Sequence, residues 1–195
     1  MLQGQPSPQP SPPRGEGGRF ASVAAWDTRV SLSLQARRST LSNKLFSAFS
    51  WSGAGGVWFA LAGVLWIASV NHVELFPRQV HFLAAMIAAL AALIVGGVIK
   101  RIAGRRRPFA TDRGITRAIW APGPARSFPS THAATSIALA VALLMIAHPL
   151  APIVVLWAFG VSFSRVWLGV HFASDVICGA LLGVAFGVLP WPALL

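Results

Sequence analysis

Five long apolar runs, separated by short polar breaks, constrain this chain more than any other feature of its sequence. They cover residues 46–70, 80–99, 131–147, 151–167 and 172–189. About 20 apolar residues in a row are enough to cross the hydrocarbon core of a bilayer as a helix. Of the 195 residues, 55% are hydrophobic and only 11% are charged, whereas a soluble domain carries about 25% charged residues. The sequence therefore predicts an all-α, multi-span transmembrane helical bundle.

The polar breaks predict how the runs are connected. Residues 71–78 form a short polar hairpin, residues 148–152 form a tight turn with two prolines, and residues 101–126 form a longer loop rich in Pro and Gly. Because successive spans alternate in direction, that loop, the start of the third run and the link between the fourth and fifth runs should meet at one membrane face. A single functional site at that face would collect residues from all three places.

The segment ahead of the runs divides into two parts. Residues 1–25 are rich in Pro, Gly, Ser and Gln, and predict a disordered tail that lacks the apolar centre of a secretory signal. Residues 26–45 mix apolar residues with Asp27 and four basic side chains, a pattern typical of a helix lying in the membrane interface. A short break is expected at residues 41–43. We expect one membrane domain, residues 26–195, with five spans plus this interfacial helix.

The net charge of +11 raises the question of a nucleic-acid partner. The basic residues are nearly all arginines, and most lie in the N-terminal region or in residues 100–126, outside the apolar runs. That distribution favours phosphate head groups and anionic lipid over a DNA-binding face. Cys178 is the only cysteine, which excludes a disulfide within the chain and any multi-cysteine metal site.

Three ionisable residues interrupt the apolar sequence where the fourth run ends and the fifth begins: Arg165, His171 and Asp175. Charged groups in membrane segments are costly and usually functional. His171 and Asp175 are four residues apart and would share one face of a helix. A carboxylate on one imidazole nitrogen fixes the tautomer and leaves the other nitrogen free as a nucleophile or base. The plainer alternative is a histidine bonded to an aspartate for helix stability.

Two further constellations favour the functional interpretation. Lys100 and the pair Arg107-Pro108 end the second run, and Pro129-Ser130-Thr131-His132 opens the third. In order, K-x6-RP, PSxH and SRxxxGxHxxxD resemble the three signature motifs of the type 2 phosphatidic acid phosphatase superfamily. Lipid phosphate phosphatases, bacterial undecaprenyl-pyrophosphate phosphatases and vanadium haloperoxidases belong to it. The motifs span residues 100–175, and their order and spacing make the resemblance specific. Family members commonly have six spans, so the N-terminal part departs from that pattern.

The resemblance implies roles for the catalytic residues. His171 is the expected nucleophile, forming a phosphohistidine, and Asp175 orients its ring. His132 is the expected acid for the leaving oxygen and the base for water, since one histidine must begin as a free base and the other as a proton donor. The remaining histidines, His72, His81 and His148, fall near the opposite membrane face and are expected to be bystanders.

The phosphate-binding residues follow from the same motifs. A transferred phosphoryl group is stabilised mainly by positive charge and hydrogen-bond donors. Arg101, Arg105 and Arg106 are interpreted instead as contacts to water or anionic lipid. Thr131 stands where the family usually has Gly, which keeps a backbone donor but could narrow the pocket. The expected phosphate-binding set is Lys100, Arg107, Ser130, Thr131 and Arg165.

The favoured function is a membrane phosphatase without metal or other cofactor, because Mg²⁺ sites want carboxylates and the sequence shows no acidic cluster. The favoured substrate is undecaprenyl pyrophosphate, with phosphatidate, phosphatidylglycerophosphate and lipid A phosphates as close alternatives. A lipid phosphotransferase would use the same residues. A haloperoxidase ranks last, and a non-catalytic lipid-binding protein is disfavoured because every charged or hydrogen-bonding motif residue is present.

The expected location is a bacterial inner membrane, and the sequence leaves the oligomeric state open. Two arguments conflict on sidedness. The excess of basic residues near the site would make that face cytoplasmic, whereas the family resemblance implies the periplasmic face. Several of those arginines are needed for phosphate binding and are poor topological markers, so the periplasmic face is expected.

Overall fold

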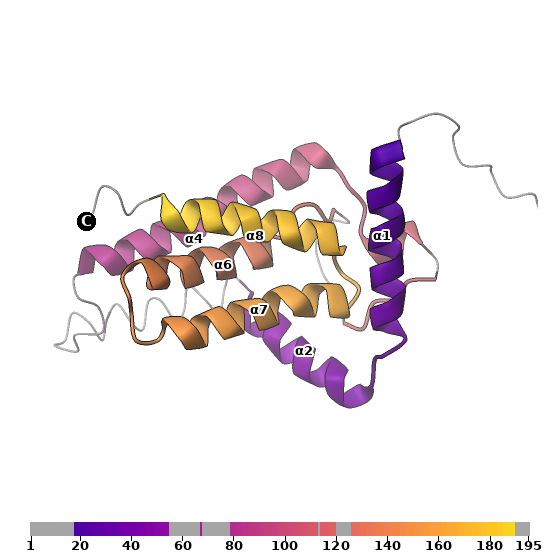
Figure 1. Ribbon diagram of the computed structural model, residues 1–195, viewed down its shortest axis with the longest axis horizontal. Helices are drawn as coiled ribbons and strands as arrows, with labels where there is room; N and C mark the ends of the chain where they lie inside the picture. The colour runs from indigo at the N-terminus through magenta and orange to yellow at the C-terminus, as the bar shows by residue number, and fades with distance from the viewer. Residues whose placement is uncertain (1–17, 55–66, 68–78, 113, 120–125, 190–195) are drawn as a thin grey trace, which may run out of the picture.

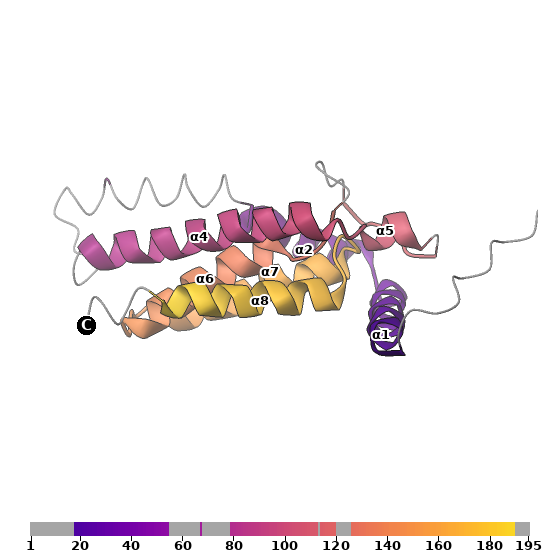
Figure 2. The same cartoon turned by 90° about the horizontal axis from the view of Figure 1, so that it is seen from above.

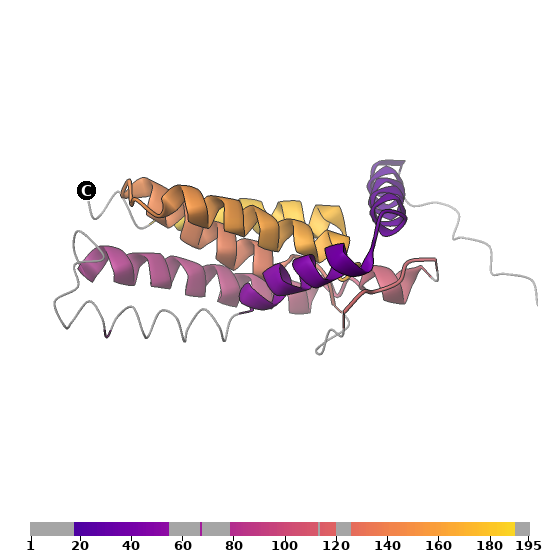
Figure 3. The ribbon, with the colours of Figure 1, turned by 90° about the horizontal axis from the view of Figure 1, so that it is seen from below.

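The computed structural model describes residues 18–54, 67, 79–112, 114–119 and 126–189. The four long helices α4, α6, α7 and α8 run side by side, and α1 crosses one end of this bundle (Figures 1 and 2). Viewed from the other side, α2 crosses below α7 (Figure 3). No strand occurs in the described ranges, as an all-α fold predicts. The helices are α1 (Gly18–Gln35), α2 (Thr40–Ser52), α4 (Gln79–Ala103), α5 (Pro108–Thr111), α6 (Thr131–Met145), α7 (Ala151–Trp167) and α8 (Ala173–Val188).

Four of the predicted apolar runs correspond to helices. The run at 151–167 coincides with α7, and α6 and α8 lie inside the third and fifth runs. Helix α4 continues four residues past the predicted end of its run, because Lys100–Ala103 contain no helix breaker before Gly104. Of the helices in the described ranges, the one over Val80–Ala103 is long and apolar enough to cross a membrane, and α6, α7 and α8 are shorter apolar helices. The number of spans stays a prediction.

The N-terminal boundaries differ from the sequence prediction. Helix α1 begins at Gly18, inside the predicted tail, because residues 18–25 hold no proline and three alanines. The break falls at residues 36–39 instead of 41–43, because Ser39 caps α2: its Oγ accepts from the Ser42 N–H at 3.2 Å, and the Ser42 Oγ accepts from the Ser39 N–H at 2.9 Å. Residues 1–17, most of the first apolar run and the hairpin at 71–78 lie outside the described residues.

Small side chains fill the interior of the bundle, and large apolar side chains face outward. On α4 the buried positions are Ala84, Ala85, Ala88 and Ala92, together with Phe82 near its start. The exposed positions recur every three or four residues. They are Leu83, Ile87, Leu90, Ile94 and Val98. A soluble bundle would bury that stripe, whereas small residues at helix contacts and large ones outside are typical of helices packed in lipid.

Helix α6 lies at the centre and packs against α4, α7 and α8. Its contact with α8 is set by Gly179, Gly183 and Gly187, one turn apart on α8. A Cβ at Gly183 would lie 2.5 Å from the Ala134 carbonyl oxygen, and one at Gly179 would lie 2.4 Å from that of Ser130. Only glycine permits so close an approach of two helix backbones, and the approach fixes the start of α6 against α8.

The turn after α7 is fixed by two features. Gly169 has a φ of +73°, and a Cβ there would lie 2.5 Å from the Thr116 carbonyl oxygen, so the position requires glycine. The Arg38 guanidinium donates to the Trp167 carbonyl from Nε at 2.6 Å and to the Thr116 carbonyl from Nη1 at 2.7 Å. Arg38 thereby satisfies a carbonyl at the C-terminal end of α7, a position that favours positive charge. The turn is held where it presents His171 to the bundle.

Candidate active site

The three sequence motifs meet at the end of the bundle that α1 crosses (Figure 1). This end contains the C-terminal turns of α4 and α7 and the N-terminal turns of α6 and α8. His171 lies in the link between α7 and α8, and Ser130 is the N-cap of α6. The convergence expected from alternating helix directions is therefore present. His81 and His148 lie towards the opposite end of α4 and α6, while His72 is outside the described residues.

His171 is 1% exposed, and its backbone N–H donates to the Arg165 carbonyl at 3.1 Å. Burial, followed by the positive charges of Arg165, Lys100 and Arg107, lowers the pKa of His171 well below its usual value. The imidazole is therefore neutral at pH 7, the form in which a ring nitrogen carries a free electron pair. His132, in the first turn of α6, interacts electrostatically with His171 and the same three cations.

Asp175, in the first turn of α8, lies beside Nδ1 of His171 and is fully buried. Its Oδ2 is 3.6 Å from His171 Nδ1 and accepts from the Phe172 N–H at 2.9 Å. The separation is an ion-pair distance, longer than a hydrogen bond, and Nδ1 has no hydrogen-bond partner among the described residues. The other carboxylate oxygen, Oδ1, is 2.7 Å from Arg105 Nη1. Nδ1 thus faces the carboxylate, which leaves Nε2 as the nitrogen available for chemistry.

Arg107 and Arg165 bring buried guanidinium groups to the site, 7% and 5% exposed. Within the described ranges, Nε and Nη1 of Arg107 and Nε of Arg165 have no hydrogen-bond partner. Arg165 Nη1 donates to the hydroxyl of Ser50, a buried residue of α2. Burial and then the charge of Arg117 lower the pKa of Arg107, which remains a cation at neutral pH. Donors of this kind, fixed and unpaired, suit the oxygens of a phosphoryl group.

Ser130 is fully buried and connects α6 to α8. Its N–H donates to the Asp175 carbonyl at 2.9 Å, and its Oγ accepts from the Ala133 N–H at 3.5 Å. The loop before it is tied to Arg105 by the Ser127 N–H, which donates to the Arg105 carbonyl at 2.7 Å. These bonds place the loop that carries Arg107 beside the first turn of α6.

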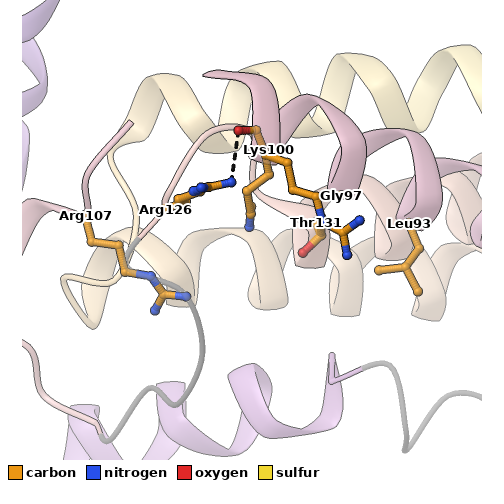
Figure 4. A pocket seen from close by; sticks show the side chains of 7 residues that line it. Leu93, Gly97, Lys100, Arg107, Arg126 and Thr131 are labelled. Carbon is orange, nitrogen blue, oxygen red and sulfur yellow. Dashed lines mark hydrogen bonds between the residues drawn. The ribbon is translucent and has the colours of Figure 1, made fainter. Parts of the chain in front are cut away.

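A cavity of about 560 Å³ opens between α4 and the start of α6 (Figure 4). Its inner wall carries Lys100, Arg107 and Thr131, and the side chains of Lys100 and Thr131 lie close together in the view. Leu93 and Gly97 extend the wall along the apolar part of α4. Two more arginines complete the lining, Arg101 and Arg126, whose Nη1 donates to the Arg101 carbonyl at 2.9 Å. The cavity therefore joins a cationic pocket to an apolar helix face.

One sequence interpretation is wrong. Arg105 was assigned to water or lipid contacts, but its guanidinium is bonded to Asp27 and to Asp175, each at 2.7 Å. Asp27 of α1 and Ser50 of α2 also belong to the site and were not predicted. Their partners lie 78 to 147 residues away in the chain, so no local spacing marks them. The available signal was an isolated acid, Asp27, in a segment whose other charges are basic.

The family model described as the PAP2 superfamily matches residues 79–194. The chain belongs to the PAP2 superfamily. The match begins with α4 and includes every residue predicted for the site. It starts after α1 and α2, so Asp27 and Ser50 lie outside the matched range.

Three of the similar proteins are named as phosphatases. The chain is 30% identical over 137 residues to a lipid A 4'-phosphatase of Bacteroides thetaiotaomicron, covering 62% of this chain and 60% of that protein. It is 34% identical over 127 residues to a decaprenylphosphoryl-5-phosphoribose phosphatase of Mycobacterium tuberculosis, covering 65% of this chain and 69% of that protein. It is 28% identical over 109 residues to the undecaprenyl-diphosphatase BcrC of Bacillus subtilis, covering 56% of this chain and 55% of that protein. The matched segments thus span about half to two thirds of these proteins' lengths.

Two solved structures share the fold. The crystal structure of Aquifex aeolicus LpxE superposes with a TM-score of 0.69 and 24% identity, covering 84% of this chain and 93% of that one. The crystal structure of a transmembrane PAP2-type phosphatidylglycerolphosphate phosphatase from Bacillus subtilis superposes with a TM-score of 0.71 and 21% identity. The match covers 86% of this chain and 84% of that one. At these identities the likeness concerns the fold alone.

Proposed function

We propose that this protein is a membrane phosphatase that removes a phosphoryl group from a lipid phosphate or lipid diphosphate through a phosphohistidine at His171. The observation that carries the proposal is a fully buried imidazole beside three cations, two of which have unpaired buried N–H groups within the described ranges. An anion of three oxygens placed on those donors would bring its phosphorus to the imidazole. The named relatives are phosphatases of the same superfamily, which supports the same activity here.

In the proposed mechanism, His171 Nε2 forms the P–N bond while the P–O bond to the leaving group breaks. Positive charge develops on the ring, and the carboxylate of Asp175, 3.6 Å from Nδ1, stabilises it. His132 protonates the leaving oxygen and then takes a proton from the water that hydrolyses the phosphohistidine. Lys100, Arg107 and Arg165 offset the charge on the phosphoryl oxygens.

The first turn of α6 is proposed to complete the phosphate site. Ser130 supplies its hydroxyl, and its own N–H is already bonded to Asp175. The N–H groups that follow, beginning with that of Thr131, lie at a helix N-terminus, where the dipole favours an anion. The Thr131 side chain lines the cavity, so the change from the family's usual glycine narrows the space next to Lys100.

A bacterial inner membrane is the proposed location. The outward apolar stripe of α4 continues on other helices, with Ile153, Leu156 and Phe159 on α7 and Leu181 on α8 all exposed. On α1, Val23 and Trp26 are exposed, as expected for a helix lying in the interface. The catalytic domain is proposed to comprise residues 26–195, because α1 is bonded to α8 through Asp27.

The proposed substrate is undecaprenyl diphosphate. Four cationic side chains line the cavity. Arg107 is buried and Lys100 half-buried, and we call these two the inner tier; Arg101 and Arg126 are exposed and form the outer tier. A diphosphate could place its terminal phosphoryl group on the inner tier and its second phosphate on the outer tier, while the prenyl chain lies against Leu93 and the outer face of α4. A monophosphate would leave the outer arginines to water.

The test of function is transfer of label from a ³²P-labelled lipid diphosphate to the purified protein. The wild-type protein should release phosphate and accumulate an acid-labile, base-stable phosphoenzyme after rapid quenching. His171→Ala should show neither. His132→Ala should still become labelled from a substrate with a good leaving group, but it should hydrolyse the intermediate slowly. Equal labelling of wild-type and His171→Ala proteins would show that another residue is the nucleophile.

Sidedness is tested by labelling single cysteines in a Cys178→Ser background. Ala110, exposed on α5, marks the site end, and Leu150, exposed before α7, marks the other end. With the site at the periplasmic face, an impermeant maleimide should label Ala110→Cys in intact cells and should label Leu150→Cys only after permeabilisation. The reverse pattern would place the site in the cytoplasm.

A further inference from the structure

A fully buried acid on the helix that crosses the end of the bundle reaches the active site through an arginine. Asp27 of α1 is 0% exposed. Its Oδ1 accepts from the Ser174 N–H at 2.9 Å, and its Oδ2 accepts from the Ser174 hydroxyl at 2.5 Å. The second donor to Oδ2 is Arg105 Nη2 at 2.7 Å. Asp27 therefore caps the first turn of α8 from a different helix and also binds a cation.

Arg105 carries that connection to Asp175. While Nη2 holds Asp27, Nη1 donates to Asp175 Oδ1 and to the Ser174 hydroxyl, each at 2.7 Å. The guanidinium carbon lies 4.3 Å from the centre of the Phe172 ring, which restricts its plane. The side chain is 29% exposed, whereas both carboxylates are fully buried. The groups form a continuous series from Asp27 through Arg105 and Asp175 to His171.

The charges in this series have a consequence for His171. Arg105 by itself would cancel the negative charge of Asp175, which the imidazole needs when it becomes positive. Asp27 supplies a second negative charge to the same guanidinium. Two carboxylates and one guanidinium together carry −1, so the cluster still presents a net negative charge to Nδ1.

We propose that Asp27 is a positioning residue of the active site: it holds Arg105 and balances its charge, so that Asp175 stabilises the imidazolium formed when His171 attacks phosphorus. The inference rests on the proposed function, because that step is the one in which Nε2 bonds to phosphorus and the ring gains positive charge. It assigns the interfacial helix α1 a part in turnover, although α1 contributes no group that touches the phosphate.

The test is a double-mutant cycle on the full-length protein in lipid nanodiscs. Asp27→Asn keeps the shape and brings the cluster to a net charge of 0, Arg105→Gln brings it to −2, and the double variant restores −1. The measured quantities are the rate constant for phosphoenzyme formation in a single turnover and the KM for a lipid diphosphate. Asp112→Asn is the matched control, since Asp112 lies at the same end and its carboxylate accepts a hydrogen bond within its own turn, from the Gly114 N–H at 2.8 Å.

Asp27→Asn should slow phosphoenzyme formation by about tenfold or more, by analogy with the groups that orient metal-binding histidines, whose loss costs about 10–100-fold. KM should stay unchanged, because no phosphate contact is lost. The double variant should recover most of the lost rate, and Asp112→Asn should match the wild-type protein. A role confined to holding α1 in place predicts the opposite, with the double variant slower than either single variant.

The inference fails if Asp27→Asn has the wild-type rate, or if the double variant shows no recovery relative to Asp27→Asn. Should Asp27→Asn not fold, Asp27→Glu keeps the charge and tests the same point. It should retain a rate within a few fold of wild type, and a loss of about tenfold or more would contradict the charge argument. A wild-type protein that forms no phosphoenzyme would instead overturn the proposed function, and this inference with it.

Discussion

Replacing Gly183 by alanine should separate α8 from α6 and destabilise the bundle. The added Cβ would lie 2.5 Å from the Ala134 carbonyl oxygen and 3.0 Å from both the Ala138 nitrogen and the Ile137 Cβ. Two of these atoms are backbone atoms of a neighbouring helix, so no side chain can rotate away and the helices must move apart. Overpacking of this kind costs about 1–3 kcal/mol. In a chain of this length each kcal/mol lowers the unfolding temperature by about 2–4 °C.

The assay is thermal unfolding of the purified proteins in the same detergent, monitored by both circular dichroism and tryptophan fluorescence. Gly97→Ala is the stability control, because a Cβ there meets nothing within 4 Å. Alanine should stabilise that helix position by about 0.5–1 kcal/mol. Opposite shifts at the two positions are therefore expected. An unfolding temperature for Gly183→Ala equal to or above that of the wild-type protein would refute the close approach of α6 and α8.

Three further predictions concern the site. Because burial and the neighbouring cations lower the pKa of His171 below its usual value, the acid-side midpoint of kcat/KM should lie below pH 6.5. A midpoint above 6.5, after correction for the substrate's own ionisation measured by ³¹P NMR, would contradict this prediction. Changing both Arg101 and Arg126 to Gln should raise KM for a lipid diphosphate by about tenfold or more, because one or two charge-assisted hydrogen bonds are lost. KM for a lipid monophosphate should change little. Equal effects on the two substrates would exclude a second phosphate site at these arginines. EDTA should leave turnover unchanged, and a loss of activity in EDTA that Mg²⁺ restores would show a metal requirement. Vanadate should inhibit competitively, because it mimics the five-coordinate phosphorus of the transition state.

The sequence predicted the long helices well because a single local property, apolarity, determines them. Helix α7 coincides with its apolar run, and α6 starts at Thr131 as expected because Ser130 caps it. The N-terminal boundaries were less accurate. There the sequence mixes polar and apolar residues, and the Ser39–Ser42 capping pair determines where α2 begins.

The site divides in the same way. Its motif residues were predicted because a short spacing along the chain identifies them, and the structure brings them to one end of the bundle. Arg105 is the first of three successive arginines, and nothing local marks it as the one that contacts Asp175. Its two carboxylate partners are 78 and 70 residues away in the chain. Pairing over such distances follows from helix packing, which a single sequence does not specify.

The alanine and glycine interior has a consequence for the tail of a lipid substrate. The backbones of α6 and α8 approach so closely that a hydrocarbon chain has no room between them. For the proposed lipid substrate, we therefore expect the tail to lie outside this pair of helices, with the membrane forming one wall of the binding site. We expect such a protein to be indifferent to tail length once the tail is long enough to partition into lipid. Selection among lipids would then fall to the head group, and the supply of substrate would depend on lateral diffusion.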